Sequence, residues 1–138
     1  MRKFLLATHG KFAEGIYDSL ERIIGKQTNI STLCAYTEDD FDINRRVKEI
    51  INSISDEDEL IIITDIYGGS INNEFMKYLS LPNIYLISGL NLSLVIELVF
   101  SQETDTEKMI SDALDVSKKS IKFCNPLLDS EKIKDEEF

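Results

Sequence analysis

The sequence predicts an α/β protein built on a doubly wound, mostly parallel sheet of about four strands, with helices on both faces. The first observation is a series of short apolar runs that alternate with segments whose apolar residues recur at helical spacing. The second is that these runs are continuous, as in ELIIITD at 59–65, which is typical of strands buried on both faces of a parallel sheet. A length of 138 residues suits one domain of this class.

The first strand and helix are predicted in residues 3–25. The run KFLLAT at 3–8 indicates a buried strand that ends at His9 and Gly10. From Phe12 onward a helical stripe follows, and Gly25 is placed to end it as a C-cap. The other apolar members of the stripe are Ile16, Leu20, Ile23 and Ile24.

A second strand and helix are predicted next. NISTLCAY at 29–36 is rich in residues that favour strands. Thr37 and Asp40 have the spacing of a capping pair for the helix that follows. That helix is marked by Val47, Ile50, Ile51 and Ile54.

The third and fourth strand–helix pairs complete the sheet. The strand at 59–65 ends in Asp65, after which YGGS turns into a helix carrying Ile71, Phe75, Met76 and Leu79. NIYLIS at 83–88 predicts the fourth strand. Gly89 and Asn91, a residue typical of N-caps, then lead into LSLVIELVF, a helix apolar enough to be largely buried.

The C-terminal part is predicted to hold one more helix and a late strand. Residues 106–119 form an amphipathic helix, and the alternating SIKFC at 120–124 indicates an antiparallel edge strand. The domain is therefore expected to span residues 1–124, and residues 125–138 are expected to form an acidic, flexible tail.

Composition excludes several classes of protein. No apolar stretch approaches the ~18 residues of a membrane span, and FLLAT becomes polar at HGK too early for a secretory signal, so a cytoplasmic location is expected. Cys34 and Cys124 are expected to be reduced thiols. The net charge of −10 argues against binding to nucleic acid. It fits either a basic protein partner or a merely solvated exterior.

Three candidate residues fall where such sheets bind ligands, at the carboxyl ends of the strands: His9, Asp65 and Gly89. His9 is the one histidine of the chain, and it is either a structural or exposed side chain or a nucleophile for phosphoryl transfer. For transfer, one ring nitrogen must be unprotonated while the other donates to an acceptor. Asp65 is either that acceptor or an ordinary carboxylate at a turn.

The stretch DIYGGS at 65–70 offers groups that bind a phosphoryl oxygen. Gly68 and Gly69 let backbone amides approach an anion, and Ser70 can cap the next helix and donate a hydroxyl; a plain turn is the alternative. The amide near Gly10 is a further candidate donor. The Thr8 hydroxyl either adds to this set or satisfies its own backbone.

Other chemistries lack the residues that they require. One histidine and two distant cysteines cannot form a conventional zinc site, so no metal is expected. The sequence contains neither GxGxxG nor GxxxxGK[ST], so no nucleotide cofactor is expected. The GxSxG motif of a serine nucleophile elbow is missing as well.

Three segments together resemble the IIA domain of the mannose/fructose/sorbose family of the bacterial phosphoenolpyruvate-dependent sugar phosphotransferase system (PTS). They are LLATHGKFAEGI, IIITDIYGGSINNEF and LISGLNLSLVIEL, and the likeness spans residues 1–124. The resemblance implies that His9 receives a phosphoryl group from the phosphocarrier HPr and passes it to a IIB domain. It also implies that Asp65 bonds the histidine ring and that Ser70 and the preceding glycines hold the phosphoryl oxygens.

The resemblance further implies a homodimer in which a late strand, here SIKFC, crosses to the partner, and contact with the membrane only through the IIC and IID subunits. Ile71 and Ser93 stand where the family often has proline. The loss of proline is expected to loosen the loop or to expose one more N–H donor. Two rival functions remain: a regulatory module that transmits phosphorylation state, and the related subunit of dihydroxyacetone kinase. The GGS loop favours the sugar branch, whereas the sugar itself is not predicted.

Overall fold

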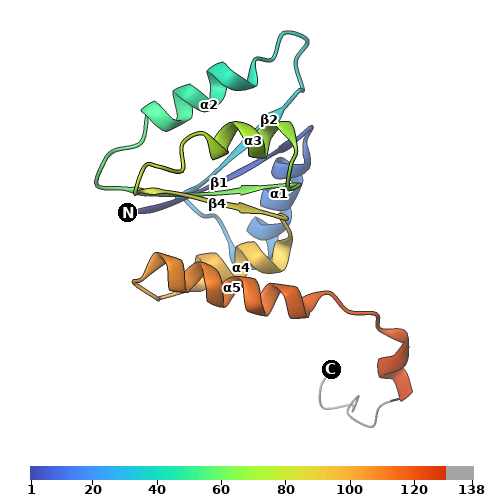
Figure 1. Cartoon of the computed structure of the whole chain (residues 1–138). Helices are drawn as coiled ribbons and strands as arrows, with labels where there is room; N and C mark the ends of the chain where they lie inside the picture. The colour runs from blue at the N-terminus through green and yellow to red at the C-terminus, as the bar shows by residue number, and fades with distance from the viewer. Residues whose placement is uncertain (130–138) are drawn as a thin grey trace. The chain divides into compact units, whose positions relative to one another are not determined.

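The structure, a computed structural model, describes residues 1–129 of the chain. It contains two compact units, residues 1–95 and a second unit that begins at Ile96. The first unit holds the sheet and the helices connecting its strands (Figure 1). None of the helices formed by residues 1–129 has both the length and the apolarity that crossing a bilayer requires.

The sheet has four parallel strands in the order β2-β1-β3-β4. They are β1 (Arg2–His9), β2 (Ile30–Ala35), β3 (Glu59–Thr64) and β4 (Ile84–Ser88). Ala7 of β1 lies beside Leu33 of β2 and Thr64 of β3, and Thr64 lies beside Ser88 of β4. The carboxyl ends of all four strands therefore meet at one edge of the sheet.

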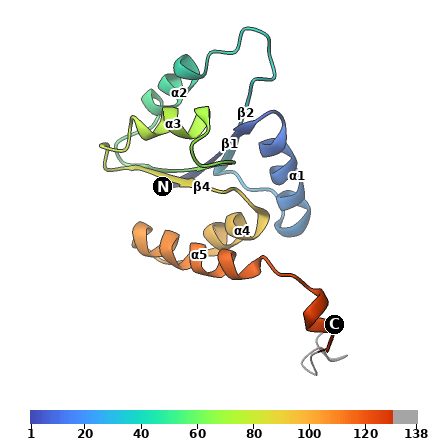
Figure 2. The same ribbon diagram turned by 45° about the vertical axis from the view of Figure 1, so that its right-hand side comes forward.

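Helices cover both faces of the sheet, as the sequence predicts. α1 (Phe12–Ile24) lies on one face, and α2 (Ile43–Asn52) and α3 (Ser70–Met76) lie on the other (Figures 1 and 2). Leu5 and Ala7 of β1 share a core cluster with Val47 of α2 and Phe75 of α3. Successive strand residues point to opposite faces, so Phe4 and Leu6 point the other way; they too are buried. The doubly wound α/β class is thus confirmed.

The strand order creates a switch point between β1 and β3. After β1 the chain forms α1 on one face of the sheet and then adds β2 on one side of β1. After β3 it forms α3 on the opposite face of the sheet and then adds β4 on the other side of the β1–β3 pair. Loops that diverge in this way leave a crevice at the carboxyl ends of the two strands, where α/β proteins bind ligands.

Some helix ends follow the prediction and others do not. Gly25 ends α1 at a φ of 84°, in the left-handed region that glycine adopts readily. The cap predicted for α2 at Thr37 and Asp40 is wrong. Asp42 is the N-cap, and its carboxylate accepts from the Arg45 amide at 3.2 Å. The Thr37 hydroxyl instead donates to the Cys34 carbonyl at 3.1 Å, inside a longer loop.

The last helix of the first unit, α4 (Leu92–Phe100), runs into the second unit. Asn91 caps it as predicted, since its side-chain oxygen accepts from the Leu94 amide at 3.0 Å. Ser93, one of the two positions that depart from the family pattern, lies in the first turn after this cap. α3 ends at Met76, earlier than predicted, so Leu79 lies in an exposed turn.

The second unit contains α5 (Thr106–Ser120), which Asp105 caps, and Met109 and Ala113 of this helix are buried. Residues 121–124 form no strand with the rest of residues 1–129, so the predicted antiparallel strand is not found in the single chain. Its exchange in a dimer stays a prediction. A short 3-10 helix covers Asn125–Asp129, and the remainder of the predicted tail, 130–138, lies outside the described residues.

Candidate functional site

The switch point brings His9 and Asp65 together. His9 is the last residue of β1, and Asp65 directly follows β3, the neighbouring strand. The backbone N–H of His9 donates to Asp65 Oδ2 at 2.8 Å, and His9 Nδ1 lies 2.9 Å from the same oxygen. Asp65 Oδ1 accepts from the Ile66 amide at 3.0 Å. The predicted pair is therefore joined by two hydrogen bonds and fixed by a third.

These bonds determine which nitrogen of His9 carries the proton. Partial burial raises the pKa of Asp65, but the hydrogen bonds from the His9 backbone and ring together outweigh it, and the pKa of Asp65 lies below its ordinary value. At neutral pH Asp65 is a carboxylate, which can only accept. Nδ1 must then donate, so Nε2 of the neutral ring keeps its lone pair.

The His9 ring is accessible while its partner is not. The side chain of His9 is 45 % exposed, whereas that of Asp65 is 15 % exposed. A lone pair on an accessible ring, with an anion behind the opposite nitrogen, is the arrangement of an activated nucleophile. The carboxylate also stabilises the positive charge that develops on the ring when Nε2 forms a bond.

The loop from Asp65 to Ser70 packs against this ring. A Cβ on Gly69 would lie 2.9 Å from Ile66 Cγ2 and 3.3 Å from His9 Cε1, so only glycine fits there without displacement. Gly68 has a φ of 80°, and its carbonyl accepts from Asn73 Nδ2 at 3.1 Å. The Gly69 amide donates to the Ile66 carbonyl at 3.3 Å. The loop is therefore closed by its own bonds although Ile71 replaces the family's proline.

The start of α3 provides unused hydrogen-bond donors. Within residues 1–129, the amides of Gly68, Ser70 and Ile71 donate to no acceptor. The first amides of a helix are orphaned by geometry and carry partial positive charge. Ile71 adds an N–H that a proline would lack, and its side chain is fully buried in the core. These donors lie in the loop that borders the His9 ring.

Two predicted residues have structural roles. Thr8 is fully buried, and its hydroxyl oxygen accepts from the Ala13 amide at 2.8 Å, so it fixes the start of α1. The Gly10 amide donates to the Ala35 carbonyl at 2.8 Å and continues the sheet ladder. Gly10 itself has a φ of 58°, which lets the chain turn after His9. The Gly10 amide is thus occupied, and the Thr8 hydroxyl oxygen accepts a bond within the protein.

Sequence analysis missed Tyr36. This residue follows β2, and its ring stacks on that of His9 with a centroid distance of 5.6 Å and an interplanar angle of 29°. Its hydroxyl lies 2.7 Å from Ser70 Oγ. Ser70 is therefore not the cap of α3, which is Gly69, but a partner of Tyr36. The sequence could have indicated Tyr36, because the end of β2 lies at the same sheet edge as the end of β1.

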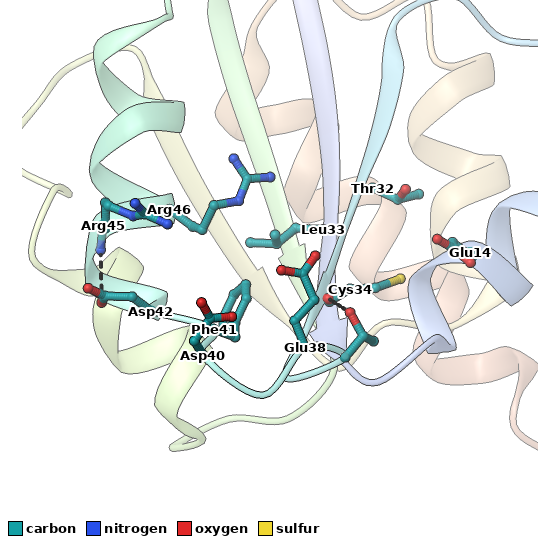
Figure 3. Close-up of a pocket in the computed structure, with 11 residues that line it drawn as sticks. Glu14, Thr32, Leu33, Cys34, Glu38, Asp40, Phe41, Asp42, Arg45 and Arg46 are labelled. Carbon is teal, nitrogen blue, oxygen red and sulfur yellow. Dashed lines mark hydrogen bonds between the residues drawn. The ribbon is translucent and has the colours of Figure 1, made fainter.

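A separate pocket of about 260 Å³ lies beside the edge strand β2 (Figure 3). It is lined by β2, the loop that follows it, the start of α2 and Glu14, and its charged groups include Glu38, Asp42, Arg45 and Arg46. His9, Asp65 and Ser70 are not among its lining residues. Residues 1–129 contain no group of three or more His, Cys, Asp or Glu side chains arranged to hold a metal ion.

Comparison with known proteins shows the family to which the chain belongs. The family model EIIA-man, described as PTS system fructose IIA component, matches residues 3–114. A candidate phosphoenolpyruvate-dependent sugar PTS permease from Klebsiella pneumoniae is 48 % identical, with a TM-score of 0.90 over 92 % of this chain and 93 % of that chain.

Two further solved structures are similar. The PTS IIA protein associated with the fucose utilization operon of Streptococcus pneumoniae is 27 % identical, with a TM-score of 0.75 over 93 % of this chain and 96 % of that one. The mannose/sorbose specific IIA subunit from Enterococcus faecalis, at 20 % identity, shares the fold, with a TM-score of 0.79 over 88 % and 93 % of the two chains. Since the family model covers most of its length, the chain belongs to the EIIA-man family and is a phosphotransfer component of the sugar phosphotransferase system.

Proposed function

We propose that His9 accepts a phosphoryl group from phospho-HPr and passes it to the IIB domain of the same sugar system, for phosphorylation-coupled sugar uptake. The observation that carries this proposal is the bond between His9 Nδ1 and the Asp65 carboxylate at 2.9 Å, which in the neutral form of this accessible ring leaves the lone pair on Nε2. The 48 % identity to a candidate sugar PTS permease favours the sugar branch over the kinase branch.

The transfer follows from the charges around the ring. Nε2 attacks the phosphorus as the bond between phosphorus and the carrier's histidine nitrogen breaks, and the carrier's ring leaves with that electron pair. Positive charge develops on the His9 ring, where Asp65 stabilises it through the Nδ1 hydrogen bond. The phosphoryl oxygens are held by the amides of Gly68, Ser70 and Ile71 and by the Ser70 hydroxyl. One such donor contributes about 3 kcal/mol to a transition state.

An open site of this kind suits partners that are themselves proteins. Phe12, Ile66 and Tyr67, the last 76 % exposed, present apolar side chains next to His9 and Asp65 in the sequence. Exposed apolar groups beside a reactive side chain are typical of a docking surface. Glu38 and Asp40 are exposed carboxylates in the loop after Tyr36. They would attract basic rims on HPr and IIB.

The proposal places the chain in the cytoplasm, with the membrane reached only through IIC and IID, and includes a homodimer. The segment after α5 supports an exchanged strand, since Ile121 and Phe123 are alternate apolar residues that are 80 % and 75 % exposed. Sedimentation of the full chain should give a dimer. Truncation before Ser120 should give a monomer that still accepts phosphate; a truncated dimer would place the interface elsewhere.

The proposed function is tested by incubating the chain with radiolabelled phosphoenolpyruvate, enzyme I and HPr. The wild type should gain an acid-labile label, and adding a IIB domain should remove it. His9→Gln should stay unlabelled while keeping the wild-type circular dichroism spectrum. Tyr17→Phe, which removes a hydroxyl that donates to the Gln27 carbonyl, is the control and should label normally. Label on the glutamine variant would refute the assignment.

A further inference from the structure

Tyr36 occupies a backbone conformation that tyrosine rarely adopts. It is the one non-glycine residue of the described chain with a positive φ, 62°, in the left-handed region. A Cβ in this region crowds the following carbonyl, so a turn that needed only this conformation would be better served by Gly or Asn. The side chain of Tyr36 therefore has to offset the strain through its contacts.

Those contacts connect the two sides of His9. β1 lies between β2 and β3 in the sheet. Tyr36 follows β2, and Ser70 begins the helix after β3, so the 2.7 Å contact between their hydroxyl oxygens spans the end of β1. Phe41 makes a T-shaped contact with the Tyr36 ring at a centroid distance of 5.2 Å. The Tyr36 side chain thus contacts His9, Ser70 and Phe41.

The hydrogen bond to Asp65 does not by itself fix the plane of an exposed imidazole. It anchors one atom, Nδ1, and leaves rotation of the ring about that contact. The Tyr36 stack constrains one face of the ring, and the Gly69 α-carbon region borders Cε1. In-line transfer depends on the direction of the Nε2 lone pair, because small displacements from the reactive geometry cost rate steeply.

We propose that Tyr36 is a positioning residue for the phosphoryl transfer: its ring holds the plane of His9, and its hydroxyl orients the Ser70 hydroxyl toward the phosphoryl group. The proposal rests on the proposed function of His9. A hydroxyl has one hydrogen and two acceptor sites. When Tyr36 donates to Ser70, the hydrogen of Ser70 is free for a phosphoryl oxygen, so the two hydroxyls form a directed chain toward the anion.

The experiment separates the ring of Tyr36 from its hydroxyl. Tyr36→Asn removes the stack and suits the left-handed backbone, whereas Tyr36→Phe keeps the stack and removes the hydroxyl. Single-turnover phosphorylation by phospho-HPr gives a maximal rate and a half-saturating concentration for each variant. Tyr36→Asn should lower the maximal rate about tenfold, near the most that an aromatic pair contributes, with little change in half-saturation. Tyr36→Phe should lower it about threefold.

The hydroxyl chain has its own test. If Tyr36 acts through Ser70, the double variant Tyr36→Phe with Ser70→Ala should transfer no more slowly than Ser70→Ala alone. Additive losses would show that the tyrosine hydroxyl acts by another route. Tyr17→Phe serves as the matched loss of a hydroxyl and should leave the rate unchanged, because its partner is the Gln27 carbonyl.

Nuclear magnetic resonance of the His9 ring protons tests the positioning independently of transfer. In the wild type and Tyr36→Phe, the stacked aromatic ring should shift these protons upfield, and Tyr36→Asn should lose that shift. Unshifted wild-type protons, or a wild-type rate for Tyr36→Asn, would overturn the inference. A wild type that shows the shift but takes no label would refute only the function of His9. If Tyr36→Asn does not fold, Tyr36→Leu, with the backbone strain of tyrosine, takes its place.

Discussion

The corner after β1 and the corner after β3 differ in how their backbone is used. After β1, the amides of His9, Gly10 and Ala13 donate to Asp65, Ala35 and Thr8, respectively. After β3, the amides of Gly68, Ser70 and Ile71 find no acceptor within residues 1–129. The corner after β1 presents the His9 side chain, and the corner after β3 presents unused backbone donors beside it.

The two corners perform different tasks in one site: the first holds the nucleophile, and the second binds the transferred group. A nucleophile must point in one direction, so His9 gains from the bonds that hold its own amide and those of Gly10 and Ala13. A group that arrives and leaves needs donors that are unoccupied between transfers. Asp65 joins the two corners, since it follows β3 and yet bonds the ring and the amide of His9.

Asp65→Asn should produce the largest loss in this comparison. The amide carries no charge to stabilise the developing imidazolium, and its NH₂ can donate to Nδ1 and shift the proton to Nε2. We expect transfer from phospho-HPr to slow about 10²- to 10³-fold in a protein that still folds. Asp18→Asn, which breaks an exposed ion pair with Arg22 on α1, is the control and should transfer normally. Wild-type rates for Asp65→Asn would remove this carboxylate from the mechanism.

Gly69→Ala should give a smaller loss by steric means. The φ of Gly69 is −70°, which alanine adopts, so the effect comes from the new methyl group and not from the backbone. That methyl would lie 2.9 Å from Ile66 Cγ2 and 3.3 Å from His9 Cε1 and must displace the loop or the ring. We expect about tenfold slower transfer, measured in a single turnover.

Gly15→Ala is the matched control for this substitution. Gly15 lies within α1, and a Cβ there would meet nothing within 4 Å. Alanine should therefore stabilise the helix by about 0.5–1 kcal/mol and leave transfer unchanged. Equal rates in the two alanine variants would show that the loop tolerates the methyl group and that its contact with the ring is not needed.

The sequence predicts the sheet and the reactive pair because both depend on local pattern and strand position. Continuous apolar runs identify the strands, and the residues at their ends, His9 and Asp65, meet because parallel strands finish at one edge. The same rule extends to Tyr36 at the end of β2. Its role was missed because a stacked ring with a positive φ depends on a loop conformation that no local pattern encodes.

Predictions of hydrogen bonding were less accurate for the same reason. Thr8 and Gly10 adjoin His9 in the sequence, but strand alternation turns the Thr8 side chain away, and the sheet ladder uses the Gly10 amide. The late strand predicted at 120–124 is not found among residues 1–129, where this segment pairs with no strand. Contacts of this kind are fixed by tertiary or quaternary structure, and sequence proximity to a reactive residue does not determine them.

Thr8→Val should affect stability and not transfer. The substitution keeps the shape of the side chain and leaves the Ala13 amide without its acceptor in a fully buried position. We expect urea denaturation to show a loss of about 1–2 kcal/mol in the free energy of unfolding. The transfer rate per folded molecule should stay within about twofold of the wild type. A much slower variant would return the Thr8 hydroxyl to the phosphoryl site.

Acidification should give the smallest of these effects, through Asp65. Partial burial raises the pKa of Asp65, but the hydrogen bonds from His9 lower it more, so its pKa in the folded protein is below that in the unfolded chain. Such a carboxyl contributes stability above its unfolded pKa of about 3.9 and loses it as the pH falls through the folded pKa. Asp65→Asn cannot titrate and lacks this dependence.

The measurement is the free energy of unfolding of the wild type and of Asp65→Asn from about pH 5 down to about pH 2.5. Below about pH 4 the wild type should lose stability faster than the variant. The free energy of unfolding of the wild type minus that of the variant should therefore only decrease as the pH falls. Asp58 and Glu74, whose pKa values are also lowered by bonds to cations, titrate in both proteins and cancel in the difference. A difference that stays constant over the whole range would mean that the bonds to His9 do not stabilise the charged form of Asp65, and the corner after β1 would then owe its rigidity to Thr8 and the sheet ladder alone.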